Sequence, residues 1–161
     1  MNETLAYFIN LVILSILGII YLLTFIRSKK RYLEKLIGGN NRSTFILLIS
    51  GLLSASINLY NITEAISDAI IYFVKIDYYL KAMTYAFSFT VSSWIFSMLL
   101  FKYSFFIVGL ITEENEKNEL INDNYRLALL HGVILTSLSL IISPAIVKIA
   151  ISFIPYPNLP F

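Results

Sequence analysis

The sequence contains no cysteine and a single histidine, His131, among its 161 residues. Without cysteine, the chain cannot form a disulfide, offer a thiol nucleophile or bind a metal through thiolates. One histidine is too few for a typical transition-metal site. Charge is also scarce, because only 14% of residues are Asp, Glu, Lys or Arg, and the net charge of +2 is too small to indicate nucleic-acid binding. We therefore expect no metal, no cofactor and no nucleic-acid partner.

Apolar residues take the place of the missing charge. They make up 58% of the chain, and the mean hydropathy is +0.77. Soluble domains usually hold about 45–50% apolar and about 25% charged residues. Four apolar segments, at about 5–26, 44–62, 84–111 and 127–154, are each long enough to cross roughly 30 Å of hydrocarbon as a helix. The sequence predicts an all-α integral membrane protein with one transmembrane domain of four helices in contact with the lipid bilayer.

The chain offers little that could carry catalysis. It has no Gly-rich phosphate loop, no nucleophile with an adjacent base, and no paired carboxylates within an apolar segment. We predict that it is not an enzyme.

A short motif occurs twice. Leu36 to Arg42 reads Leu-Ile-Gly-Gly-Asn-Asn-Arg, and Leu120 to Arg126 reads Leu-Ile-Asn-Asp-Asn-Tyr-Arg. Four of the seven positions match, and each copy lies between two apolar segments. The motif therefore predicts two helical-hairpin repeats, about 1–81 and 82–161, that run in the same direction through the membrane.

The loop at 27–43 carries half of the basic residues in the chain, and it predicts the orientation. The six are Arg27, Lys29, Lys30, Arg31, Lys35 and Arg42. The positive-inside rule places this loop, and with it the acidic loop 112–126, in the cytoplasm of a bacterial inner membrane, with both termini outside. The basic residues could simply set topology, bind anionic lipid headgroups or dock a cytoplasmic protein. Because they follow the first apolar segment, that segment is expected to be a membrane helix and not a signal peptide.

The outer connection, residues 63–81, has apolar residues at near-helical spacing and tyrosines suited to an interface. We expect a short external amphipathic helix there.

Two helix faces are rich in small and polar residues. Gly51, Ala55 and Asn58 recur at i, i+4 and i+7, which favours close helix packing over a pore lining. The last apolar segment carries a longer stripe, and we take it as a candidate pore lining: Gly132, Thr136, Ser139 and Ser143.

Two ionisable residues lie within the apolar segments. The repeat aligns Lys102 with Gly18, well inside the membrane, so Lys102 could face a cavity or could extend towards the headgroups. It is a further candidate pore-lining residue. His131, near the inner end of the last segment, could relay protons or sense pH, or could simply be a hydrogen-bonded interfacial histidine.

The hairpin pattern resembles the small inner-membrane proteins of domain-of-unknown-function family 350. The residues that carry the resemblance are Leu36, Ile37, Asn40 or Asn41, and Gly51 in the first half, and Leu120, Ile121, Asn124 and Gly132 in the second. The resemblance implies four helices in two tandem hairpins, and it implies no activity. The segment 63–81 and the acidic second loop depart from the family pattern.

These features support three hypotheses. The first is a homo-oligomer that forms an ion-conducting or membrane-permeabilising pore between subunits. The second is a membrane anchor or sensor that docks a cytoplasmic partner through its charged loops, for example in an envelope-stress or phage-defence (antiviral) complex. The third is a secondary transporter, which four helices without a broken helix at the midplane support least.

Overall fold

In the computed structural model, helices fill almost all of the described residues, 3–37, 41–76, 78–112 and 116–155. The side chains of 3–6 and 35–37 lie outside this description. The helices are α1 (Glu3–Ile37), α2 (Arg42–Lys75), α3 (Tyr79–Ile111), α4 (Glu116–Ile121) and α5 (Tyr125–Ser152). Four of them are long and apolar enough to cross a membrane. The predicted all-α membrane fold is confirmed.

The long helices exceed the predicted spans. They contain 28 to 35 residues, whereas about 20 residues cross the hydrocarbon. The residues predicted for a short outer helix are helical, but they continue α2 without a break to Lys75. The reason is burial: Ala65, Ile66, Ala69 and Ile70 are inaccessible inside the bundle, so this segment packs against its neighbours as part of α2. The one short helix of the described chain is α4.

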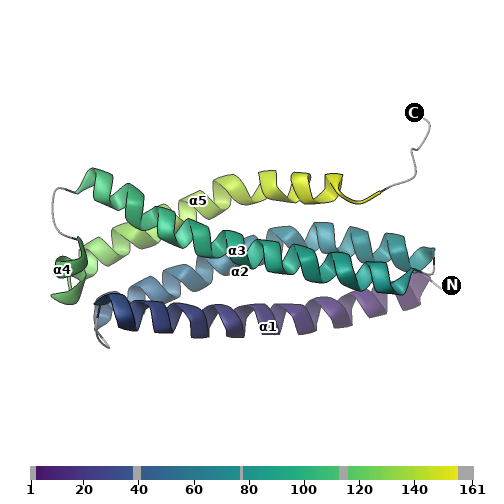
Figure 1. Ribbon diagram of the computed structural model, residues 1–161, viewed down its shortest axis with the longest axis horizontal. Helices are drawn as coiled ribbons and strands as arrows, with labels where there is room; N and C mark the ends of the chain where they lie inside the picture. Colours follow the sequence, from purple (N-terminus) through teal and green to yellow (C-terminus); the bar gives the residue numbers. More distant parts are fainter. Residues whose placement is uncertain (1–2, 38–40, 77, 113–115, 156–161) are drawn as a thin grey trace.

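The helices form two parallel hairpins, as the repeat predicted (Figure 1). α1 and α3 run in one direction, and α2 and α5 run in the other. α1 begins and α5 ends at one end of the bundle, which we call the terminal end. The turns of both hairpins and α4 lie at the opposite end, the hairpin end. α2 is the central helix and packs against α1, α3 and α5.

The repeated motif forms the N-terminal caps of α2 and α5. The Asn41 side chain accepts a hydrogen bond from the Thr44 amide at 2.8 Å, and the Asn124 side chain accepts one from the Leu127 amide at 3.3 Å. Asn41 therefore corresponds to Asn124, one position away from the alignment that the sequence matches suggest.

The two caps also join the hairpins. The Asn41 Nδ2 donates to the Leu120 carbonyl oxygen at 2.9 Å, and the Asp123 Oδ1 accepts from the Ser43 amide at 2.8 Å. Asp123 reaches this position with a left-handed backbone, at φ 62°. At the hairpin end, a side chain from each half of the chain thus forms a hydrogen bond with the backbone of the other half.

Candidate functional site

A hydrogen-bond network crosses the middle of the bundle and joins all four long helices. Ser143 of α5 donates to the Asn58 Oδ1 of α2, and the Asn58 Nδ2 donates to the Ser97 Oγ of α3 at 2.7 Å. The Tyr21 hydroxyl of α1 donates to the same Ser97 oxygen at 2.7 Å. Ser97 in turn donates to the Ser93 carbonyl at 3.0 Å. Asn58 is 3% exposed and Ser97 is 1% exposed, so the network replaces water inside the bundle.

The stripe on α5 faces α2 within the same chain. Ser139 lies 2.5 Å from the Ser54 hydroxyl, and Gly132 is buried against Ser50. Thr136 is half-buried and bonds back to the Gly132 carbonyl at 2.8 Å. The candidate pore residues of α5 therefore form a close interface between two helices.

The face of α2 with Gly51, Ala55 and Asn58 is buried as well. A Cβ on Gly51 would lie 3.3 Å from the Phe101 ring and 3.5 Å from the Phe25 ring. An alanine at this position would therefore need the Phe101 ring to shift by a few tenths of an ångström.

The bundle interior beside this network is tightly packed. The cavity next to Asn58 measures about 10 Å³, which is no larger than one water molecule. Ions do not fit through such a space.

Lys102 lies on the outer surface of the bundle and is exposed. Its neighbour Phe101 lies under the Lys29 ammonium, and the charge of Lys102 acts electrostatically on Lys29. Lys102 is thus level with Lys29, and not with Gly18. The alignment with Gly18 fails because the second hairpin contains α4 between its two long helices, whereas in the first hairpin α2 begins soon after α1 ends. The spacing between the two copies of the motif therefore does not apply to the residues of α3.

Lys29 is the one buried member of the basic segment among those with described side chains. It is 3% exposed, and its Nζ lies 3.7 Å from the centroid of Phe101, with the Phe25 and Tyr32 rings at 5.5 and 5.7 Å. Aromatic faces attract a cation, so this cage holds α1 against α3.

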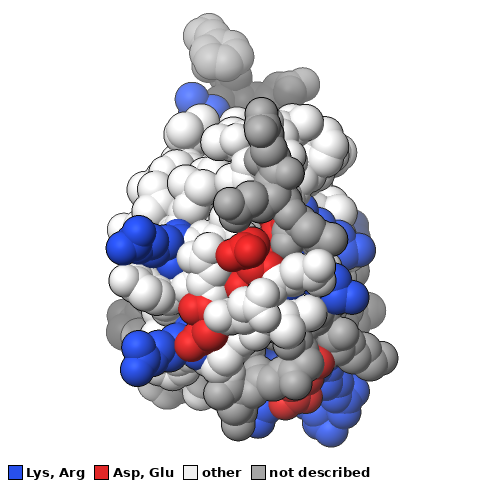
Figure 2. Space-filling view, turned by 90° about the vertical axis from the view of Figure 1, so that its left-hand side faces the viewer, with Lys and Arg blue, Asp and Glu red and all other residues white. Residues whose placement is uncertain are grey.

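The other basic residues surround the hairpin end. Arg27, Lys30, Arg31 and Arg42 are exposed, and the Lys35 side chain lies outside the described part. Figure 2 looks onto this end and shows basic side chains around the rim with acidic side chains between them.

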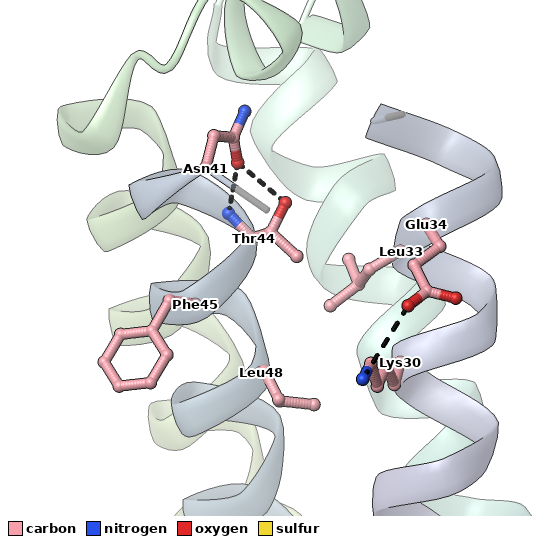
Figure 3. Close-up of a pocket in the computed structure, with 7 residues that line it drawn as sticks. All are labelled: Lys30, Leu33, Glu34, Asn41, Thr44, Phe45 and Leu48. Atoms are coloured by element: carbon pink, nitrogen blue, oxygen red, sulfur yellow. Dashed lines mark hydrogen bonds and ion pairs between the residues drawn. The ribbon is translucent and has the colours of Figure 1, made fainter. Parts of the chain in front are cut away.

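A groove of about 330 Å³ opens at the hairpin end between the end of α1 and the start of α2 (Figure 3). Leu33 and Leu48 extend towards each other from the two helices, and Phe45 also lines the groove. The rim is polar, with a Lys30–Glu34 ion pair at 3.9 Å on one side. Asn41 and Thr44 bond each other on the opposite side, so their polar atoms already have partners.

His131 lies in a separate cluster close to α4. It is 1% exposed, its ring centroid is 4.2 Å from that of Phe105, and its Nε2 is 3.5 Å from the Glu116 Oε2. Neither ring nitrogen has a hydrogen-bond partner among the described residues. The Thr112 hydroxyl donates to the Glu116 Oε1 at 3.3 Å. Burial raises the pKa of the Glu116 carboxyl above its ordinary value.

No family model, curated protein or solved structure matches the chain. The resemblance to domain-of-unknown-function family 350 therefore stays a prediction, and the assignment of function rests on geometry.

Four of the residues that make these contacts were not singled out from the sequence, namely Tyr21, Ser93, Ser97 and Glu116. Tyr21 is a polar aromatic residue in the middle of the first apolar segment, and Ser93 and Ser97 are spaced by four in the third segment. These two patterns could have identified the three residues from the sequence. Glu116 gave no signal, because it is one of several acids in a loop and its proximity to His131 arises only from the folding of α4.

Proposed function

We propose that the chain is a subunit of a homo-oligomeric membrane assembly whose ion path lies between subunits, next to α3. The observation that carries the proposal is a set of four exposed polar residues on the otherwise apolar outer face of that helix. Thr84, Ser88, Ser92 and Lys102 lie on one side of α3, and all four are exposed. Lys102 is level with Lys29 near the hairpin end, so it would lie at the mouth of such a path, where water or a neighbouring copy would solvate it. A ring of lysines would favour anions and repel cations.

Placing the hairpin end in the cytoplasm of a bacterial inner membrane is part of this proposal. It is supported by the exposed Arg27, Lys30 and Arg31 at the end of α1 and by the positive-inside rule. Both termini then face outwards. Single cysteines added at either end of this cysteine-free chain would test the orientation by labelling of intact cells.

The experiment is ion flux through liposomes that contain the purified chain, together with the mass of the complex. We expect an oligomer and an anion-selective flux that Lys102→Leu reduces at least about tenfold. Lys148→Leu is the matched control, because Lys148 is an exposed lysine on α5 near the terminal end. A monomer, or equal flux from wild type and Lys102→Leu, would contradict the proposal.

A second candidate function is docking of a cytoplasmic partner, and the hydrogen bonds that join the two hairpins at the hairpin end favour it. The bonds from Asn41 to Leu120 and from Ser43 to Asp123 fix the two charged connections relative to each other. Such a platform suits an anchor or sensor subunit, for example in an envelope-stress or phage-defence complex.

Charge reversal at exposed positions tests the docking function. We expect the triple change Arg27→Glu, Lys30→Glu and Arg31→Glu to abolish co-purification of a partner, while Lys148→Glu at the opposite end leaves it intact. Lys29 is left unchanged, because it is buried. A chain that purifies alone and conducts ions counts against this second candidate.

A further inference from the structure

The groove between the end of α1 and the start of α2 is amphipathic (Figure 3). Leu33 is fully buried and Leu48 is half-buried, and both line the groove together with Phe45, whose side chain is 63% exposed. Lys30 is the basic residue among the side chains that line it. A ligand that matches this groove therefore needs apolar groups for Leu48 and Phe45 and an anionic group for Lys30.

The groove leads into an exposed apolar strip on α2. Phe45, Ile49 and Leu53 recur every four residues, so they lie on one face of this helix, and all three are exposed. α2 is long and apolar enough to cross a membrane. On α1, Leu23 and Ile19 form a second exposed apolar pair before the basic segment. A long apolar chain thus has a surface to follow from the groove towards the middle of the bundle.

The charge beside the groove is mainly positive. Arg27, Lys30 and Arg31 are spaced by three and four residues from the first, so they lie on one side of α1, and all three are exposed. Glu34 is the one acid among the described side chains at this end of α1, and it pairs with Lys30 at 3.9 Å. An exposed ion pair of this length contributes little free energy, so an anionic ligand can replace Glu34 as the partner of Lys30.

We propose that this groove binds an anionic phospholipid of the surrounding bilayer, with the phosphate paired to Lys30 and an acyl chain on Phe45, Ile49 and Leu53. Basic pockets between membrane helices suit headgroups of this class. A zwitterionic lipid brings no net negative charge to the basic side of α1, and a water-soluble anion leaves the apolar strip uncovered. The site is independent of the proposed ion path, and it takes up part of the surface on which a partner protein would dock.

Native mass spectrometry of the purified chain in a mild detergent tests the proposal. Bound lipid is counted in titrations with phosphatidylglycerol and with phosphatidylcholine of the same chain length. We expect wild type to prefer phosphatidylglycerol, and Lys30→Gln to lower its affinity about fivefold, the effect of one basic residue near a headgroup. Lys148→Gln is the matched control, because Lys148 is an exposed lysine of α5 near the terminal end. Glu34→Gln should raise the affinity, since it removes the competing carboxylate.

A second pair of variants separates the groove from general attraction by charge. Phe45→Ser removes apolar surface from the groove without a change of charge, and it should lower the affinity for phosphatidylglycerol at least about threefold. Phe106→Ser is the matched control, because Phe106 is also 63% exposed but lies on α3, away from the groove. Both side chains are on the outer surface, so we expect both variants to fold.

Each outcome decides the proposal. Weaker binding of phosphatidylglycerol in Lys30→Gln and Phe45→Ser, with both controls unchanged, supports it. Equal binding of the two lipids by wild type overturns it, and so does an equal loss in Lys30→Gln and Lys148→Gln, an unchanged affinity in Phe45→Ser or a lower affinity in Glu34→Gln. Unchanged lipid binding in Lys30→Gln together with the loss of a co-purifying protein would assign the groove to that protein and likewise overturn the proposal.

Discussion

The Asn41 side chain donates a hydrogen bond to the backbone carbonyl of Leu120 at 2.9 Å while its own Oδ1 caps α2. The side-chain amide of Asn41 thus caps a helix of the first hairpin and also bonds to the backbone of the second hairpin. Asp123 makes the reciprocal contact through the Ser43 amide. The two copies of the repeated motif bind each other directly, so the hairpin end is a joint between the halves.

This joint predicts different effects for two substitutions at one position. Asp123→Asn should be close to neutral, because asparagine tolerates the left-handed backbone and can accept from the Ser43 amide. Asp123→Ala should cost about 1–2 kcal/mol, since the amide loses its partner and the strained backbone remains. Unfolding in a mild detergent titrated with sodium dodecyl sulfate gives both values. Equal losses in the two variants would mean that the Asp123–Ser43 bond is unimportant.

The buried network predicts a measurable cost for Asn58→Leu. The change removes both interhelical bonds of Asn58, to Ser97 and Ser143, and we expect a loss of about 1 kcal/mol, the size found for polar pairs within membranes. Asn61→Leu is the control, because among the described residues the Asn61 amide bonds within its own helix, to the Ile57 carbonyl at 3.0 Å. The same unfolding titration should show little change for the control, and a larger loss there than in Asn58→Leu contradicts the role of the network.

The close contact between Gly132 of α5 and Ser50 of α2 predicts that a second substitution restores the stability lost through a first one. A Cβ on Gly132 would lie 3.0 Å from the Ser50 Cβ and closer still to its hydroxyl, so Gly132→Ala forces the helices apart and should cost about 1–3 kcal/mol. Ser50→Gly in the same chain removes the clash and should recover most of the loss. Gly18→Ala provides the comparison, because its Cβ meets only Leu59, at an ordinary 3.7 Å. Thermal midpoints of the wild type and these three variants suffice, and the absence of any rescue would refute the contact.

The position of Phe101 predicts a contrast between two phenylalanines five residues apart. Phe101 is fully buried and lies under the Lys29 ammonium, whereas Phe106 is 63% exposed. Phe101→Ala should cost about 3–5 kcal/mol and loosen α1, since the buried lysine loses its aromatic partner. Phe106→Ala should stay within about 0.5 kcal/mol. Thermal midpoints measure the cost, and protease cleavage within α1 measures the loosening. Similar losses in both variants would rule out a special role for the Lys29–Phe101 contact.

The features that the sequence predicted are those fixed by local pattern. Uninterrupted apolar segments predict membrane helices, and the repeated motif predicts two hairpins. The structure adds that the asparagines of this motif cap α2 and α5. The chain crosses the membrane twice between the two copies of the motif. Both copies therefore lie on the same side of the membrane, and the two hairpins run in the same direction. These properties need no knowledge of which helix lies beside which.

The features that the sequence left open depend on lateral neighbours. The small and polar stripe on α5 is equally consistent with a pore lining and with a packing surface as long as the position of α2 is unknown. The height of Lys102 was misjudged, because the repeat was extended across α4, which has no counterpart in the first hairpin. The pairing of His131 with Glu116 likewise required the path of α4, and composition alone does not specify such a path.

The parallel hairpins also bear on how such a chain could originate. Two copies of a single hairpin, related by a two-fold axis along the membrane normal, would place their second helices side by side, as α2 and α5 lie here. Because both hairpins have the same orientation in the bilayer, a duplication followed by fusion needs no reversal of topology. The joining piece between Lys75 and Tyr79 is only a few residues long. A helix pair that once assembled from two molecules could in this way become the interior of one.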